Sequence, residues 1–261
     1  MVDTEERGLG ILDKANAILS VLESGRELTA GEIAQSTGAP ASSTYRLLRS
    51  LTALNLVDPG SKTGLYRIGV YFLFVGGLVE QRLDLREAAR GVLQDLLADT
   101  GWSCTLYVPR GSRAICLERF EPTSIRTTTV RVGDALPLHL GAGPRASLAF
   151  LPEAQQRAVL DQVYVSGQPA SQGLRRPRHM IESQLQQDRQ RGYAISDEEV
   201  DRGIAAVGAP IFDHRGAVLG AVAVGYMREA LLAPESRAIE VTLNAAAEIS
   251  RAMGCPPGKR R

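Results

Sequence analysis

Histidine, cysteine and serine are the residue types in this chain that could carry catalysis or bind a metal ion. The histidines are His139, His179 and His214, and the cysteines are Cys104, Cys116 and Cys255. Ser147 with His139 and an acid would form a nucleophilic triad, but the sequence lacks the G-x-S-x-G segment that presents such a serine. Cys104, Cys116 and His139 could meet around a metal, but neither C-x-x-C nor H-E-x-x-H spacing occurs. We therefore expect no catalytic residue, no metal and no cofactor, and we expect reduced thiols.

A second kind of chemistry is suggested by hydroxyl and arginine side chains between positions 42 and 50. Ser42, Ser43, Arg46, Arg49 and Ser50 are spaced at intervals of three, four and seven residues, which places them on one face of a helix. Small hydroxyls let a helix approach a duplex closely, and arginine can bond a phosphate or the O6/N7 edge of guanine. This pattern is typical of a helix that reads the major groove, although any amphipathic helix has a polar outer face.

Positive charge is concentrated around the same residues. The whole chain has a formal net charge of +1, and residues 1–80 contain seven Lys and Arg against nine Asp and Glu. Residues 40–67 contain four basic residues against Asp58 alone, a net charge of +3. Such a local excess is the footprint of a nucleic-acid binder.

Three helices are expected to position this face. Apolar residues at helical spacing predict the first over 9–24. Thr29, with Glu32 three residues later, forms a capping box that begins a second helix ending at Gly38. The third is expected over 41–55. Its buried side would consist of Leu47, Leu48, Leu51 and Leu54.

A hairpin and a connecting helix follow. Gly64 is expected at the tip of a hairpin between short strands at 56–57 and 65–68. Three helices and a hairpin in this order predict a winged helix-turn-helix over residues 1–69, a module that binds DNA or, in some proteins, another protein. Residues 70–84 are mostly apolar and predict a linker helix.

The rest of the chain mixes strands and helices. Strands are expected at 104–109, 113–120, 125–132, 193–196, 204–212 and 217–226. Helices are expected at 85–100, from 143 onward, and at 152–163, 177–192 and 234–253, with a polar loop at 164–176. The hairpins imply a mainly antiparallel sheet, so the chain is expected to be α+β, with a mixed α/β domain over 85–255 and a disordered tail over 256–261.

The hydropathy of the chain excludes a membrane protein of the helical class. No apolar run reaches the roughly 18 residues that a membrane helix needs. The polar, acidic first residues do not resemble a signal peptide. We therefore expect a cytoplasmic protein with no membrane partner.

Two segments of the second half could bind a small molecule. Gly141-Ala142-Gly143-Pro144-Arg145 begins a helix, where small residues expose backbone N–H groups and the helix dipole favours an anion. An acidic loop at 196–199 precedes an apolar strand and could supply hydrogen-bond acceptors at the mouth of a pocket. A tight turn and a solvated loop are the alternatives for these two segments.

Residues 29–57, 136–149 and 192–226 together resemble the IclR-type bacterial transcriptional regulators. The most specific of the three is 192–226, through its G-Y-x-x-x-D-E-E spacing and its A-P-I-F-D segment. The resemblance implies a winged-helix DNA-binding domain, a linker helix and a GAF-like effector-binding domain. It also implies a homodimer or dimer of dimers on a palindromic operator of double-stranded DNA. Its effectors would be small organic or aromatic acids that modulate operator binding.

Two sets of site residues follow from the patterns and the resemblance. The expected DNA-binding residues are Thr29, Ser42, Ser43, Thr44, Tyr45, Arg46, Arg49, Lys62, Tyr66 and Arg67. The expected effector-binding residues are Ala142, Gly143, Arg145, Ser196, Asp197, Ile204, Ala206, Ala223 and Gly225.

The second set departs from the family pattern in ways that bear on the ligand. Pro144 and Arg145 replace the usual Gly and Lys, and Pro144 removes one N–H donor. Ala206, Ala223 and Gly225 stand where some members have polar side chains. We therefore expect an effector that is bulkier or less polar than a two- or three-carbon keto acid. The alternative functions are a metabolite-processing enzyme and a thiol or metal sensor, each with an appended helix-turn-helix.

Overall fold

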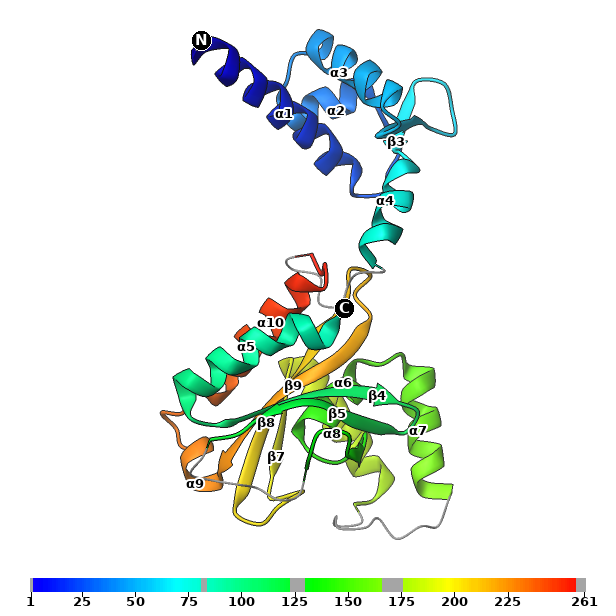
Figure 1. Ribbon diagram of the computed structural model, residues 1–261. Helices are drawn as coiled ribbons and strands as arrows, with labels where there is room; N and C mark the ends of the chain where they lie inside the picture. The colour runs from blue at the N-terminus through cyan, green and yellow to red at the C-terminus, as the bar shows by residue number, and fades with distance from the viewer. Residues whose placement is uncertain (1, 81–83, 123–129, 166–175, 257–261) are drawn as a thin grey trace. The chain divides into compact units, whose positions relative to one another are not determined.

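The computed structural model describes residues 2–80, 84–122, 130–165 and 176–256. The chain folds into two compact units, an N-terminal unit (Met1–Leu83) and a C-terminal unit (Asp84–Arg261), whose elements are labelled in Figure 1.

The N-terminal unit is a small helical domain with a three-stranded antiparallel sheet. Its elements are α1 (Val2–Leu22), β1 (Leu28–Thr29), α2 (Ala30–Thr37), α3 (Ala41–Ala53), β2 (Val57–Pro59), β3 (Leu65–Ile68) and α4 (Tyr71–Glu80). The strand order is β1-β3-β2, and β2 and β3 form the expected hairpin. The winged helix-turn-helix order is therefore present.

Local sequence signals explain where the helices of this unit begin and end. The Thr29–Glu32 capping box is present at the start of α2, and Gly38 ends that helix in the left-handed conformation, with φ +65°. Ile33 of α2 and Leu48 of α3 are fully buried in one apolar core.

Two expectations for this unit were wrong. Helix α1 begins at Val2 rather than near residue 9. Leu54 is 63% exposed because α3 ends at Ala53 and Leu54 is its C-cap residue, so it does not continue the buried stripe.

The C-terminal unit is built on a six-stranded antiparallel sheet. Its strands are β4 (Ser103–Arg110), β5 (Arg113–Phe120), β6 (Ala135–Pro137), β7 (Ala194–Asp197), β8 (Ile204–Phe212) and β9 (Val218–Met227), in the order β6-β5-β4-β9-β8-β7. Its helices are α5 (Leu85–Thr100), α6 (Ala142–Phe150), α7 (Glu153–Val165), α8 (Arg178–Arg191), α9 (Arg228–Leu231) and α10 (Ala238–Ala252).

Helices cover both faces of this sheet. Helices α5 and α10 pack side by side on one face (Figure 1). A Cβ placed on Gly220 of β9 would lie 3.6 Å from Leu85 of α5, whereas Ala223, on the opposite face of β9, approaches Gly143 of α6. Helices α7 and α8 pack against α6 through an apolar cluster that includes Leu148, Leu160 and Ile181. The start of α6 therefore lies directly over the sheet.

The main differences from expectation lie at the edges of this unit. Of the strand expected at 125–132, residues 125–129 lie outside the described part of the chain, and 130–132 are not a strand. One edge of the sheet is β6, a strand that was not expected, and the short helix α9 was not expected either. Of the expected tail, 257–261 also lie outside the described residues.

Candidate nucleic-acid interface and ligand cavity

The outer face of α3 presents the side chains that the sequence predicted. Ser42, Arg46 and Arg49 are exposed, whereas Leu48 and Leu51 on the opposite side are buried in the core of the N-terminal unit. Tyr45 is 54% exposed beside them. Ser43 is half-buried at the start of the same face. The arrangement can place two guanidinium groups and small hydroxyls against a groove of DNA.

Two of the ten expected DNA-binding side chains are used inside the fold. Thr44 is fully buried, and its hydroxyl donates to the carbonyl of Pro40 at 3.2 Å. The hydroxyl of Thr29 accepts from the backbone N–H of Glu32 and donates to the Glu32 carboxylate at 2.8 Å. Thr44 is therefore withdrawn from the expected interface, and the Thr29 hydroxyl has a structural partner.

The hairpin presents its basic residues while an acidic side chain holds it in place. Lys62 and Arg67 are exposed, and Tyr66 is half-buried against the core of the unit. The Glu27 carboxylate accepts hydrogen bonds from the N–H (2.8 Å) and hydroxyl (2.5 Å) of Ser61 and lies 3.7 Å from the Arg67 guanidinium. These hydrogen bonds hold the pKa of the Glu27 carboxyl below its usual range. Glu27 is therefore ionised, and its carboxylate holds Ser61 and Arg67 of the hairpin in place.

A cavity in the C-terminal unit lies between the sheet and the start of α6. The space between its lining residues, together with the open solvent at its mouth, amounts to about 600 Å³. Seven of the nine expected effector-binding residues line it, namely Ala142, Gly143, Ser196, Ile204, Ala206, Ala223 and Gly225. A Cβ on Gly143 would lie 2.4 Å from the ring of Tyr107, so only glycine lets α6 approach the sheet this closely.

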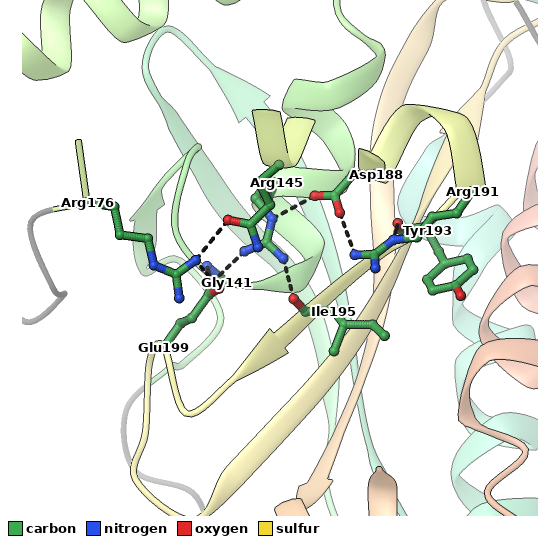
Figure 2. Close-up of polar contacts among 9 residues, drawn as sticks. Gly141, Arg145, Arg176, Asp188, Arg191, Tyr193, Ile195 and Glu199 are labelled. Carbon is green, nitrogen blue, oxygen red and sulfur yellow. Dashed lines mark hydrogen bonds and ion pairs between the residues drawn. The ribbon is translucent and has the colours of Figure 1, made fainter. Parts of the chain in front are cut away.

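Arg145 does not line the cavity, which corrects the expectation that it contacts an effector. Its side chain is only 1% exposed and is held by the protein itself (Figure 2). Nε donates to Asp188 at 2.7 Å, Nη1 donates to Glu199 at 2.6 Å, and Nη2 donates to the carbonyl of Ile195. Arg145, in the first turn of α6, therefore supplies a buried structural charge.

Asp197 is the second correction. Its carboxylate is exposed and receives two hydrogen bonds from the Arg228 guanidinium, at 2.5 and 2.9 Å. This pairing lowers the pKa of the Asp197 carboxyl. Alternation along β7 points Ser196 into the cavity and Asp197 away from it.

Several cavity residues were not identified from the sequence. The polar ones are Ser103, Thr105, Tyr107, Arg119 and Asp201. Alternation along β4 gives Ser103, Thr105 and Tyr107 a common face, and Arg119 is the cross-strand partner of Thr105. The alternation was a usable signal, but the pairing of β4 with β9 was needed to place these residues opposite Ala223 and Gly225.

The candidate residues for catalysis or metal binding are not among those that line this cavity. Burial raises the pKa of the Cys104 thiol to about 12 and of the Cys116 thiol to about 11. Burial likewise lowers the pKa of His139. The Ser147 hydroxyl contacts the carbonyl of Gly143 at 3.4 Å, inside α6. Across the described residues, no group of three or more His, Cys, Asp and Glu is arranged to hold a metal ion.

No helix in the described part of the chain combines the length and the apolar character needed to cross a membrane.

Known proteins resemble both units. The family model for the bacterial transcriptional regulator IclR C-terminal domain matches residues 78–251, and that for the IclR helix-turn-helix domain matches residues 11–59. The chain is 29% identical to the HTH-type transcriptional regulator XynR of Escherichia coli, over 98% of this chain and 99% of that protein. It is 30% identical to the HTH-type transcriptional regulator KipR of Bacillus subtilis, over 81% and 83%.

Solved structures agree with this relationship. The Agobacterium tumefaciens repressor BlcR is similar at 25% identity with a TM-score of 0.75, covering 95% of this chain and 98% of that one. HmgR of Pseudomonas aeruginosa is similar at 25% identity with a TM-score of 0.76, covering 94% and 98%. The α+β architecture and the resemblance seen in the sequence are thus confirmed. The chain belongs to the IclR family of bacterial transcriptional regulators, and it is a DNA-binding regulator of the helix-turn-helix type.

Proposed function

We propose that this regulator reads its operator with α3, and that the cavity of its C-terminal unit binds a small organic acid that changes operator affinity. The protein would act in the cytoplasm, where the operator DNA is. The observation that carries the proposal is the polar face of α3, where Arg46 and Arg49 are exposed opposite the buried Leu48 and Leu51.

The exposed residues of the N-terminal unit divide into two roles. Ser42, Ser43, Arg46 and Arg49 would contact base edges in the major groove, because they share the outer face of one helix. Tyr45, Lys62, Tyr66 and Arg67 would hold the phosphate backbone or the flanking minor groove. Thr29 would act indirectly, since its hydroxyl caps α2.

Regulation requires a ligand with different affinities for the DNA-competent and DNA-incompetent states. The cavity is suited to such a ligand because the described residues that line it combine hydroxyl groups and a guanidinium with small apolar side chains. The effector would be larger or less polar than a two- or three-carbon keto acid, since Ala206, Ala223 and Gly225 leave open apolar space.

We further propose that the protein binds as a homodimer or dimer of dimers to a palindromic operator. Helix α4 exposes several large apolar side chains, including Leu73 (76% exposed), Phe74 and Leu78. Val70, just before the helix, is exposed as well. A soluble monomer rarely exposes a contiguous apolar surface of this kind. Two-fold protein symmetry would match two half-sites one helical turn, or a multiple of it, apart.

The proposal is tested by measuring operator affinity with and without candidate acids. A duplex selected by the wild-type protein would be labelled and titrated by fluorescence anisotropy, alone and with aromatic acids, glyoxylate or pyruvate. We expect an aromatic acid to change the operator Kd. Sequence-blind binding under every condition would overturn the DNA-reading role of α3.

A further inference from the structure

The start of α6, where an effector anion was expected, already has a carboxylate from the protein. The Gly141 N–H donates to Oε2 of Glu199 at 3.1 Å, and the same oxygen accepts from Nη1 of Arg145 at 2.6 Å (Figure 2). Pro144 has no N–H to offer. The Gly141 N–H is therefore already used by the protein, and a ligand carboxylate at this helix start would lie beside the negative charge of Glu199.

The backbone beneath this helix start leaves no room either. A Cβ placed on Gly208 of β8 would lie 2.5 Å from the carbonyl carbon and oxygen of Ala142 and 2.7 Å from the nitrogen of Gly143. The first turn of α6 thus rests directly on the sheet at Gly208. A ligand carboxylate cannot lie between them.

A cationic side chain lies at a different part of the cavity. Among the described residues that line it, Arg119 on β5 is the only one with a positive charge, and its side chain is 10% exposed. Nε and Nη2 both donate to one oxygen of Glu121, at 2.9 and 2.5 Å. Nη1 points to the Thr105 hydroxyl, 3.4 Å away, which is a long hydrogen bond. The Nη1 side of the guanidinium therefore faces the polar wall of the cavity.

The cavity floor extends away from Arg119 across four further strands. Arg119 pairs with Thr105 on β4, and Thr105 pairs with Ala223 on β9. Two residues further along β9, on the same face, Gly225 pairs with Ala206 on β8, which pairs with Ser196 on β7. Four strand spacings correspond to roughly 19 Å between the outer backbones. The central positions carry only Ala or Gly, so the middle of this floor is flat and apolar, with polar groups at both ends.

We propose that the cavity binds a carboxylic acid with a flat apolar body, and that its carboxylate pairs with the Arg119 guanidinium rather than with the start of α6. The apolar body lies on the floor formed by Ala206, Ala223 and Gly225. The ligand carboxylate competes with Glu121 for Arg119. This inference rests on the proposed effector-binding function and specifies the chemical class of the ligand and the residue that selects it.

Calorimetric titration of the full-length protein tests the assignment, with benzoate and phenylacetate as probes, pyruvate as the small acid and benzamide as the neutral analogue. We expect an aromatic acid to bind at least roughly tenfold more tightly than pyruvate. Arg119→Gln should weaken acid binding at least roughly tenfold, because it removes a charge-assisted pair. Arg119→Lys should lose less, and Glu121→Gln should strengthen binding. Equal affinity of wild type and Arg119→Gln for the acids would overturn the proposal, as would failure of both aromatic acids to bind better than pyruvate.

A cavity-filling variant separates this proposal from the proposed function. A Cβ on Gly225 would have its nearest contacts at 3.7 and 3.9 Å, so this position has room for a side chain, and Gly225→Val adds bulk to the cavity floor. Acid binding lost in Gly225→Val but unchanged in Arg119→Gln would overturn the role of Arg119 and leave the effector cavity standing. Acid binding unchanged in both variants would show that the acid does not bind in this cavity. A cooperative urea unfolding transition of Arg119→Gln, followed by the fluorescence of Trp102 in the same unit, shows that the variant is folded.

Discussion

Arg145 and Asp188 form a hydrogen-bonded ion pair in which Nε donates to Oδ2 at 2.7 Å while both side chains are almost fully buried, 1% and 0% exposed. The other Asp188 oxygen accepts from Arg191 at 2.5 Å, and Glu199 accepts from both Arg145 and Gly141 (Figure 2). The pair therefore ties α6 to α8 and, through Glu199, to the loop beside the cavity.

Removal of Asp188 is expected to destabilise the C-terminal unit strongly. Asp188→Ala leaves the Arg145 charge buried with one partner fewer, which typically costs about 3–5 kcal/mol. Trp102, the single tryptophan, lies in this unit and reports its unfolding by fluorescence in urea. The matched control is Asp161→Ala, which breaks an exposed pair with Arg178 and should cost less than about 1 kcal/mol. Similar losses of unfolding free energy in the two variants would show that the buried Arg145–Asp188 pair stabilises the unit no more than an exposed pair does.

Two glycines of the cavity should respond differently to the same substitution. Gly208→Ala places a methyl group 2.5 Å from the backbone of Ala142 and should lower the free energy of unfolding by about 1–3 kcal/mol, because α6 must move. Gly225→Ala meets its nearest atoms at 3.7 Å and should change stability little. Urea denaturation of both variants checks this. A Gly208→Ala protein as stable as Gly225→Ala would contradict the described contact between α6 and β8.

The buried thiols should be unreactive and should make the fold sensitive to alkali. Burial raises the pKa of Cys104 to about 12 and of Cys116 to about 11, against an ordinary value of 9.0. Above pH 9 the unfolded chain therefore loses protons that the folded chain retains, so stability is full below pH 9 and falls as pH rises toward 11–12. Cys104→Ala should flatten this decline in pH-dependent unfolding.

Alkylation provides the companion measurement. Iodoacetamide at pH 8 should modify Cys255, which is half-buried, well before Cys104 and Cys116. Mass spectrometry of the native and the urea-unfolded protein distinguishes the sites. Rapid modification of Cys104 or Cys116 in the folded protein would favour the thiol-sensor alternative.

Much of the fold could be predicted because its signals are local. The capping box at Thr29 and the apolar strand over 204–212 depend on residues close together in sequence, and both are present as expected. The buried partners of Arg145 could not be found in this way. Asp188 is 43 residues away and Glu199 is 54 residues away, so their meeting depends on the packing of α6 against α8 and β7.

The residues of the cavity could likewise be predicted only in part from the sequence. The family resemblance alone indicated Ala206, Ala223 and Gly225. Arg119 was missed because only the pairing of β5, β4 and β9 brings it to the same sheet face. Thr44 was assigned to the interface from its neighbours in sequence, but helical rotation turns it inward.

Substitutions on α3 and on the hairpin should have different effects on DNA binding. Arg46→Ala should weaken binding to the selected operator by roughly 1–3 kcal/mol and relax base preference, whereas Lys62→Ala should weaken all duplexes similarly and reduce the salt slope by about one. Fluorescence anisotropy at several salt concentrations measures both. The matched control is Arg237→Ala, an exposed arginine of the C-terminal unit that should leave binding unchanged. Equal losses in Arg46→Ala and Arg237→Ala would remove Arg46 from the interface.

Selection of bound sequences from random duplex DNA by the purified wild-type protein tests the central claim most directly. The predicted result is an enriched palindromic site whose half-sites are one helical turn, or a multiple of it, apart, with base preference that Arg46→Ala relaxes. Repeating the selection with aromatic acids covers an operator that requires its effector. Salt-sensitive binding without any enriched sequence, with and without the acids, would contradict the account of α3 as the helix that reads the operator.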